Sequence, residues 1–452
     1  MKQNVFLIVI DSFRADKIYG KNNNSITPNF DKLINSGIYF ENSVSTSDAT
    51  LLNWAGMFTG KNSFKTGIRS TRYNKLNDDE ITLFTILKKL DYDFFGYIPN
   101  LGEIVGLFPN FKNNDSNYGD LTLHDGLGEK IINQISNFET KKPWFFYIHL
   151  EELHFPISVP KQFSDKKFGK NNYERQISHI DFWIGKFLEN LNLKETLVIV
   201  TSDHGIFLPS LTIGENIINL EEKPTIQKTV KQLHSILPSF IHPIKQEIFL
   251  LLEKYHKYRK KKILENLNLE SHQKRNLLWQ RSDLDKVLFD DLIRVPLIYN
   301  GGKLKNPKKI SQLVRIIDIF PTILDILEIP NSQKIDGRSV KPLMEGKILD
   351  DLPAFIESTP YVKLKSNDVM GIRTSKYKYF RDKENSKNRV FLFDLENDPN
   401  ENNNIAKNSP NIILEMEFIL DEILNDSKEK SIDFNEEETK SIEEELKRLG
   451  YM

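Results

Sequence analysis

Cysteine is absent from this chain of 452 residues. Its absence excludes disulfides, thiolate metal sites and cysteine nucleophiles. An excess of charge is also missing, since 62 basic residues stand against 63 acidic ones and the net charge is -1. Without a broad positive field we expect no nucleic-acid partner, and an anionic partner must be bound at a local site.

Long apolar runs are missing too. The N-terminal run from Val5 to Ile10 is shorter than the apolar core of a signal peptide, and an acidic residue follows it directly. No later segment reaches the roughly 20 consecutive apolar residues of a membrane span. We therefore expect a cytoplasmic protein without a transmembrane segment. Internal repeats and a glycine-rich phosphate loop are not found either.

Apolar residues make up 39% of the chain, which is enough for a sizeable core. Short β-branched runs alternate with helical patterns, which is typical of a parallel sheet covered by helices. Strands apolar on both faces are predicted at "NVFLIVID", "KPWFFYIHLE", "ETLVIVTSDHG" and "RVPLIYNGG". Helical spacing in "YERQISHIDFWIGKFLENL" predicts one apolar face, formed by Ile177, Ile180, Ile184, Phe187 and Leu188.

Two parts are predicted along the chain, residues 1–349 and residues 350–452. An insertion at 209–285 interrupts the first part and carries the basic run "KYHKYRKKK". We expect helices packed on the rim there, with a lid or a peripheral contact with an anionic membrane surface as the alternative. In the second part, "MGIRTSKYKYFRD" and "RVFLFDLENDPNE" predict a small antiparallel sheet, followed by a charged helical tail.

Acidic and imidazole side chains follow three of the predicted strands. Asp11 closes the first strand, His154 follows the second, and Asp203 with His204 closes the third. Ligands of open parallel sheets bind beyond the carboxyl ends of the strands. Each residue alone could form a turn or cap a helix. Their recurrence at matching strand ends favours a shared site, and two carboxylates with an imidazole suit zinc or manganese better than magnesium.

An ordered series of motifs resembles the sulfatase family of the alkaline phosphatase superfamily, almost from end to end. The series includes "NVFLIVIDSFRADKIYG", "TPNFDKLINSGIYFENSVS", "NWAGMFTG", "PWFFYIHLEELHFPI", "IDFWIGKFLENLNLKETLVIVTSDHG", "IDIFPTILDILEIP", "DGRSV", "FDLENDPNEN" and "LKRLGYM". The resemblance implies an α/β fold with a mostly parallel sheet sandwiched by helices and a small C-terminal α+β subdomain. It also implies that residues 1–349 form a sulfatase-like catalytic domain of a metal-dependent hydrolase.

The nucleophile position of the family falls on Thr50 of "TSDATLLNWAGMFTG", ten residues before the final glycine. Sulfatases proper have a cysteine or serine there, which is oxidised to formylglycine, and a proline and an arginine follow. This chain has Leu52 and Trp54 at those two positions. Threonine would give a ketone, so we expect no formylglycine. Thr46 and Ser47 are alternative hydroxyls out of register, and a purely structural Thr50 is the other interpretation.

The family resemblance also implies a metal site. Its ligands would be Asp11, Thr50, Asp203 and His204. Ser12 stands where many sulfatases have a further aspartate, so a single divalent ion is expected. We expect manganese, with calcium, magnesium and zinc as alternatives. His154 would contact the developing charge or protonate the leaving oxygen, and such acid catalysis is typically worth about 10²–10⁴-fold.

Substrate contacts are less well defined by the sequence. Arg14 is a candidate for anion contact, although it could equally support the turn after Asp11. Lys286 is the cation nearest to the "RVP" element, where the family usually has a basic residue, often histidine. The insertion lies at this point, and a replacement could come from His234, His242, His256 or His272.

A threonine nucleophile favours phosphoesters over sulfate esters. Attack on a sulfate ester would leave a covalent sulfate ester on the threonine with no easy route for its release. The phosphoryl group of phospho-threonine, in contrast, can be displaced in line by water or another acceptor. Threonine at this position resembles the phosphodiesterases and glycerol-phosphate polymer synthases of the superfamily. We therefore predict a hydrolase or phosphotransferase for an anionic phosphoester. A sulfatase, or a binding or regulatory protein that keeps the fold without turnover, is the alternative.

Overall fold

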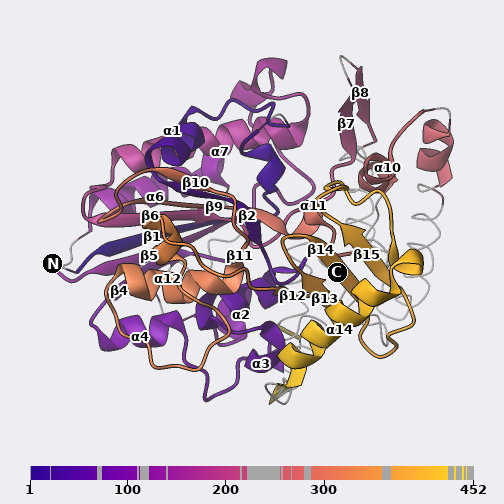
Figure 1. Ribbon diagram of the computed structural model, residues 1–452. Coiled ribbons are helices and arrows are strands. Elements are labelled where there is room, and N and C mark those ends of the chain that lie inside the picture. Colours follow the sequence, from indigo (N-terminus) through magenta and orange to yellow (C-terminus); the bar gives the residue numbers. More distant parts are fainter. Residues whose placement is uncertain are drawn as a thin grey trace.

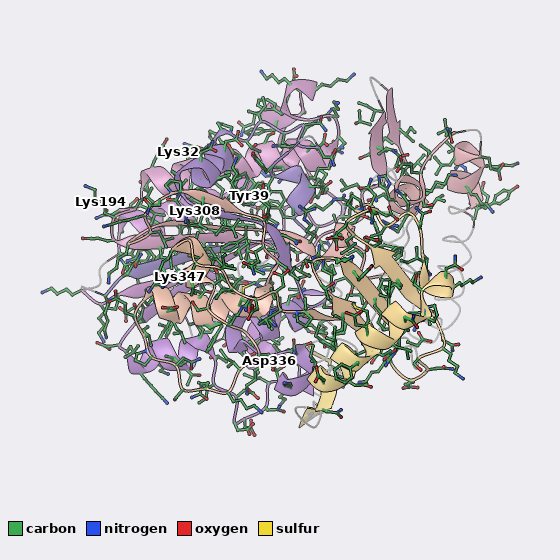
Figure 2. The ribbon with its side chains drawn as sticks, viewed as in Figure 1. Lys32, Tyr39, Lys194, Lys308, Asp336 and Lys347 are labelled. Carbon is green, nitrogen blue, oxygen red and sulfur yellow. The ribbon has the colours of Figure 1, made fainter. Side chains whose placement is uncertain are left out.

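Figure 1 shows the computed structural model of the chain, which describes residues 2–20, 22–68, 74–108, 111, 122–138, 141–213, 216–220, 255, 258–265, 267–278, 287–358, 368–425, 432–433, 440–441 and 444. A larger part built on a central sheet lies beside a smaller part with its own sheet. Lys32, Lys194 and Lys347 are exposed charged side chains at the surface (Figure 2). Among the described residues, no helix combines the length and the apolar character needed to cross a bilayer.

The central sheet has eight strands, and most neighbouring pairs are parallel. In spatial order the strands are β10 (Lys308–Ile310), β2 (Ile38–Val44), β9 (Arg294–Gly301), β6 (Thr196–Thr201), β1 (Asn4–Ile10), β5 (Trp144–Leu150) and β4 (Asp93–Tyr97), and β11 (Val314–Arg315) also pairs with β2. The predicted fold class, α/β with a mostly parallel sheet, is confirmed.

Helices cover both faces of this sheet (Figure 1). Alternate residues of β1 enter two separate apolar clusters, with Leu7 in one and Ile8 in the other, because successive side chains of a strand point to opposite faces. The first cluster is completed by α2 (Thr50–Thr59), α4 (Leu83–Lys89) and α12 (Ile319–Ile326), and the second by α1 (Pro28–Ser36), α6 (Leu127–Ser136) and α7 (Asn172–Glu189).

Helix α7 matches the helix predicted from its spacing. It begins after Asn171, whose side chain accepts a hydrogen bond from the backbone N–H of Glu174 and so caps the first turn. The predicted apolar face is buried, namely Ile177, Ile180, Ile184, Phe187 and Leu188.

The strand predicted at "RVPLIYNGG" is present as β9, but its direction differs from that of a parallel strand. Thr201 pairs with Leu297 and Leu197 pairs with Gly301, so β9 runs antiparallel to β6. After the insertion, α11 (Asp290–Ile293) leads into β9 beside the edge at which β6 ends. The chain therefore enters the sheet in the opposite direction.

The smaller part contains the antiparallel sheet expected from the sequence. Its strands are β12 (Ala354–Ser358), β13 (Val369–Arg373), β14 (Tyr377–Asp382) and β15 (Phe391–Asp394), and α14 (Pro410–Asn425) packs on it. The remaining short elements are α3 (Ser63–Thr66), α5 (Leu101–Ile104), α13 (Lys341–Met344), β3 (Asn74–Lys75) and β16 (Ile432–Asp433).

The insertion differs from the helical expectation at its start. Strands β7 (Ser210–Ile213) and β8 (Asn216–Asn219) form an antiparallel hairpin. Helix α10 (Ser271–Leu278) lies near the end of the insertion. Leu264, Leu269 and Leu277 form a small apolar cluster of their own in this region. Residues 221–254, and most of the charged tail after Asn425, lie outside the described residues. The lid and the membrane contact stay predictions.

Candidate active site

The predicted metal and nucleophile residues meet at the carboxyl edge of the central sheet. Asp11 follows β1 directly, and its backbone N–H donates to the carbonyl oxygen of Leu150 at the end of β5, at 2.8 Å. Asp203 and His204 follow β6, and Thr50 is the first residue of α2. The parallel neighbours β1, β5 and β6 end at the same edge, which is why positions so distant in sequence converge.

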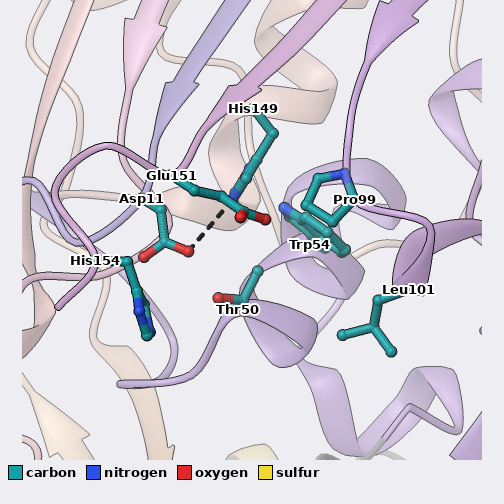
Figure 3. A pocket seen from close by; sticks show the side chains of 8 residues that line it. All are labelled: Asp11, Thr50, Trp54, Pro99, Leu101, His149, Glu151 and His154. Atoms are coloured by element: carbon teal, nitrogen blue, oxygen red, sulfur yellow. Dashed lines mark hydrogen bonds and ion pairs between the residues drawn. The ribbon is translucent and has the colours of Figure 1, made fainter. Parts of the chain in front are cut away.

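A pocket opens at this edge and contains about 280 Å³ of space, part of it open to solvent. Its lining residues, drawn in Figure 3, are Asp11, Thr50, Trp54, Pro99, Leu101, His149, Glu151 and His154. This described lining contains two carboxylates and two imidazoles, and neither lysine nor arginine. A cation or a protonated imidazole must therefore balance the acidic groups.

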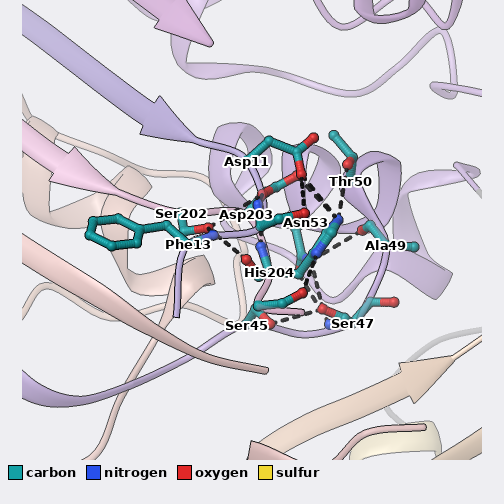
Figure 4. Close-up of polar contacts among 12 residues, drawn as sticks. Asp11, Phe13, Ser45, Ser47, Ala49, Thr50, Asn53, Ser202, Asp203 and His204 are labelled. Carbon is teal, nitrogen blue, oxygen red and sulfur yellow. Dashed lines mark hydrogen bonds and ion pairs between the residues drawn. The ribbon is translucent and has the colours of Figure 1, made fainter. Parts of the chain in front are cut away.

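The Thr50 hydroxyl lies against His204 (Figure 4), with 3.3 Å between Oγ1 and Nε2. His204 Nδ1 is 2.8 Å from the carbonyl oxygen of Gly205, and a carbonyl can only accept, so Nδ1 carries the proton of the neutral ring. The bare Nε2 then faces Asp11 Oδ1 at 3.7 Å and Asp203 Oδ2 at 3.6 Å. A nitrogen lone pair that faces two carboxylates is arranged as a metal ligand would be.

Burial and neighbouring charges set the protonation of these groups. Burial would raise the pKa of Asp11, but its hydrogen bond with His149 and the charge of His204 hold that pKa well below its usual range. Burial, followed by the charge of Asp11, raises the pKa of Asp203. Burial opposes protonation of His204, yet Asp203 and Asp11 raise its pKa. The two carboxylates thus draw positive charge to the space between them.

The donor set fits a divalent cation. Asp203 Oδ2 is buried and has no hydrogen-bond partner among the described residues. One ligand atom each of Asp11, His149 and Asp203 lie within 4.8 Å of one another. Carboxylate oxygens and imidazole nitrogens are ligands that zinc and manganese accept. Asp11, His149 and Asp203 are therefore compatible with a divalent metal, and His204 Nε2 lies 3.7 and 3.6 Å from the two carboxylates beside Thr50.

His149 is a site residue that the sequence reasoning missed. It lies inside β5, which was read as a uniformly apolar strand, and it is 1% exposed. Its Nε2 is 3.4 Å from Asp11 Oδ2. One feature of the sequence does point to His149, namely an imidazole within a strand that is buried on both faces. Such a buried polar group must find polar partners.

The loop before α2 is organised by Asn53. Its Oδ1 accepts from the backbone N–H groups of Thr46 and Ser47 at 2.9 and 3.1 Å, and from the Thr46 hydroxyl at 3.0 Å. Its Nδ2 donates to the Ala49 carbonyl at 3.1 Å. Neither Thr46 nor Ser47 lines the described pocket, so Thr50 is the hydroxyl that these contacts present to it.

Ser12 orients the carboxylates instead of adding one. Its hydroxyl donates to Asp11 Oδ1 at 2.7 Å, and its backbone N–H approaches Asp203 Oδ1 at 3.4 Å. The backbone of Ser12 has a φ of 62°, a left-handed conformation that turns the chain sharply after β1. Tyr173 of α7 stabilises this turn, since its hydroxyl donates to the Ser12 carbonyl at 2.7 Å.

His154 lines the pocket and is half-buried. Its Nδ1 lies 3.1 Å from the carbonyl oxygen of Phe155, so Nδ1 carries the proton in the neutral ring. Nε2 is then the nitrogen that can exchange a proton with a bound molecule.

Arg14 does not line the pocket. Its guanidinium pairs with Asp16 at 2.8 Å and with Asp291 at 2.6 Å, and it donates to the Ile206 carbonyl at 3.2 Å. Burial and these carboxylates leave it no open face for a substrate anion. Of the two sequence interpretations, support of the turn after Asp11 agrees with these contacts, and the proposed anion contact does not.

Of the other predicted cations, the structure describes His272. Lys286, His234, His242 and His256 lie outside the described residues. His272 is described, and its Nδ1 contacts Glu270 at 3.3 Å and Asn402 at 3.2 Å. These contacts tie α10 to the smaller part.

Comparison with known proteins agrees with this architecture. Residues 3–329 match the Sulfatase family model, and residues 283–446 match the model of the N-sulphoglucosamine sulphohydrolase C-terminal region. The chain is 31% identical to arylsulfatase K of Homo sapiens over 144 residues, 30% of this chain and 27% of that protein. It is 22% identical to arylsulfatase K of Rattus norvegicus over 304 residues, 66% of this chain and 52% of that protein. The alignments thus span about a quarter to a half of these relatives.

Solved structures share the fold over nearly the whole chain. A putative sulfatase from Bacteroides thetaiotaomicron superposes with a TM-score of 0.65 at 16% identity, covering 97% of this chain and 96% of that chain. The phosphonate monoester hydrolase of Agrobacterium radiobacter gives a TM-score of 0.62 at 16% identity, covering 94% and 96%. Because a family model spans residues 3–329, the chain belongs to the sulfatase family.

Proposed function

We propose that the protein cleaves or transfers an anionic phosphoester with Thr50 as the nucleophile. One observation carries the proposal: the Thr50 hydroxyl stands 3.3 Å from His204 Nε2, in the same pocket as Asp11 and His154. A threonine cannot be oxidised to formylglycine, and an unmodified alkoxide suits phosphorus better than sulfur because phospho-threonine can be displaced.

A divalent metal is part of this proposal. Asp11, Asp203, His204 and Thr50 would hold it, and we expect manganese, with zinc, calcium and magnesium as alternatives. When bound, such an ion supplies Lewis-acid polarisation of the ester and stabilises a deprotonated hydroxyl.

The residues of the chain take the following roles. Thr50 loses its proton to water in the pocket, and the N-terminus of α2 stabilises the resulting negative charge. Oγ1 of Thr50 attacks phosphorus, a new O–P bond forms, and the ester P–O bond breaks. His154 starts as an imidazolium with protons on both ring nitrogens, and its Nε2 gives a proton to the leaving oxygen. Water or a second alcohol then loses a proton to His154 and displaces the phosphoryl group from Thr50.

A second candidate is sulfate-ester hydrolysis. It is supported by the curated relatives, which are named arylsulfatase K, and by the sulfatases among the similar structures. A third candidate is a binding protein without turnover. The replacement of the family's arginine by Trp54 favours this candidate. Turnover that depends on Thr50 distinguishes the two enzymes from the binding protein, and the preferred ester distinguishes the first candidate from the second.

The test compares release of nitrophenol from a phosphodiester, a phosphomonoester and a sulfate ester, with the manganese-loaded protein. We expect phosphoester turnover that a chelator abolishes and that Thr50→Ala lowers by about 10³-fold or more, while Thr50→Ser keeps a measurable rate. Thr46→Val is the matched control, because its hydroxyl serves Asn53 instead of the pocket. Preferred turnover of the sulfate ester, or loss of activity in the control alone, would overturn the proposal.

A further inference from the structure

We propose that His149 is an additional ligand of the metal and makes the site selective for a transition metal over calcium. The inference rests on the proposed function only in taking a divalent metal to bind beside Asp11. It concerns a residue that neither the strand-end pattern nor the family resemblance points to.

His149 is placed against the acidic groups by the register of the sheet. Val9 of β1 pairs with His149 of β5, two residues before Asp11. The imidazole is 1% exposed and packs edge-on against Trp54, with 5.0 Å between ring centroids and an interplanar angle of 82°. Trp54 stands at the position of the family's arginine and is fully buried. The His149 ring therefore packs against the buried Trp54 ring on one side and faces the Asp11 carboxylate on another.

The distances around Asp11 match those between ligands of one ion. A hydrogen bond between ionised partners is typically about 2.7–2.9 Å long. The contact from His149 Nε2 to Asp11 Oδ2 is 3.4 Å, and those from His204 Nε2 to the two carboxylates are 3.6 and 3.7 Å. Two ligands at about 2.0–2.1 Å from a tetrahedral ion are about 3.3–3.4 Å apart. The two imidazoles thus stand at ligand spacing on either side of Asp11.

Tyr147 orients the His149 ring for this role. Its hydroxyl lies 3.0 Å from His149 Nδ1, and Tyr147 is fully buried. A hydroxyl can donate to a bare Nδ1 or accept from a protonated one. When Nε2 binds a metal, the proton must sit on Nδ1, and the Tyr147 oxygen accepts it there. Such an outer partner fixes the tautomer and the direction of a metal-bound histidine.

The chemical type of the ligand atoms favours one class of metal ion over another. Calcium takes six to eight oxygen ligands, whereas imidazole nitrogen suits zinc and related transition-metal ions, and carboxylate oxygen suits manganese. Ser12 stands at the position of a second aspartate and offers a hydroxyl that is engaged with Asp11 at 2.7 Å. With His149 included, the site presents two imidazoles and two carboxylates, a poor set for calcium.

The experiment measures metal binding by the full chain and not its activity. Isothermal titration with Mn²⁺, Zn²⁺ and Ca²⁺, and the visible spectrum of bound Co²⁺, are recorded for the native protein and its variants. We expect His149→Ala to weaken Mn²⁺ and Zn²⁺ binding by about 100-fold and to shift the Co²⁺ bands, while Ca²⁺ binding changes by less than about threefold. Tyr147→Phe should weaken Mn²⁺ binding by about 10–100-fold, the range typical of outer partners.

His154→Ala is the matched control, since it removes an imidazole from the same pocket and should change metal affinity by less than about threefold. If His149→Ala does not fold, His149→Gln keeps the volume and is measured instead. Native Mn²⁺ affinity and Co²⁺ bands in the His149 variant, or an equal loss of Ca²⁺ and Mn²⁺ binding, would overturn the proposal. Absence of Thr50-dependent turnover would contradict the proposed function, but it would not affect these binding results.

Discussion

At the scale of single residues, burial makes ordinary side chains chemically unusual around the pocket. Glu152 follows the pocket residue Glu151 and is 8% exposed. Its Oε1 accepts the backbone N–H of Leu123 at 2.8 Å, while Oε2 has no hydrogen-bond partner among the described residues. Burial raises the pKa of Glu152 to about 7. The folded protein therefore holds this proton more tightly than the unfolded chain does.

The shift predicts how stability depends on pH. Because the folded pKa lies above the ordinary value of 4.5, the contribution of Glu152 is fully present below that value and is lost as pH rises to about 7. Glu152→Gln keeps the acceptor for Leu123 and cannot ionise. Relative to the native protein, it should be near neutral at pH 4 and stabilising by roughly 1–3 kcal/mol at pH 8.

Chemical denaturation at the two pH values measures this difference in the free energy of unfolding. The exposed Glu129→Gln on α6 controls for the loss of one carboxyl group. An equal effect of Glu152→Gln at both pH values would show that Glu152 keeps an ordinary pKa in the folded protein.

At the scale of elements, helix ends and strand ends build the site. The turn after β1 is stabilised by α7, because the hydroxyl of Tyr173 bonds to the Ser12 carbonyl and accepts the Arg14 backbone N–H at 3.0 Å. Thr50, the proposed nucleophile, is the first residue of α2, where the backbone N–H groups are unpaired within the helix. Small losses of helix order would therefore move site residues.

The N-cap of α7 allows a direct test of this element. Asn171→Ala removes the side-chain acceptor for the Glu174 backbone N–H, which lies 2.9 Å away. We expect a loss of about 0.5–2 kcal/mol in the free energy of unfolding, while Asn171→Ser, which keeps a capping oxygen, loses less. Thermal or urea unfolding measures both variants. Equal losses in the two would assign the effect to packing instead of capping.

At the scale of the whole molecule, the smaller part contacts the loop that leads to Thr50. The backbone N–H of Glu357 in β12 donates to the Thr46 carbonyl at 2.8 Å, and its carboxylate accepts from the Ser63 hydroxyl. Thr46 begins the loop that leads to Thr50. The small sheet is therefore part of the framework of the site.

A buried charge cluster joins the two parts. Lys378 of β14 is fully buried, and its Nζ lies 2.5 Å from Asp290 Oδ1, 2.6 Å from Glu401 Oε1 and 3.0 Å from the Leu288 carbonyl. Lys378→Met would leave Asp290 and Glu401 buried with less positive charge. Breaking a buried ion pair in this way typically costs about 3–5 kcal/mol.

Lys376→Met is the matched control, because Lys376 is exposed, and we expect it to change stability by less than about 0.5 kcal/mol. Differential scanning calorimetry of both variants measures the effect on unfolding. Similar midpoints for Lys378→Met and the native protein would mean that the cluster does not join the two parts energetically.

Much of this protein is determined by local sequence pattern. Apolar runs predicted β1, β5 and β6, and their shared direction predicted that Asp11, Asp203 and His204 would meet, because parallel strands deliver their ends to one edge. The period of α7 predicted its buried face. The motif series predicted the family and put Thr50 at its nucleophile position, and the structure shows Thr50 as the first residue of α2.

Other features depended on neighbours that a sequence does not display. His149 contacts Asp11 across 138 positions, and only the register of β1 against β5 brings them together. The sequence left Arg14 with two equal interpretations, and its contact with Asp291, which comes from the far side of the insertion, agrees with the structural one. The direction of β9 depended on where the insertion returns the chain. Sequence pattern determines which faces are apolar, whereas the identity of a side chain's partner depends on three-dimensional distance, and that distance decided that the His149 imidazole lies beside Asp11.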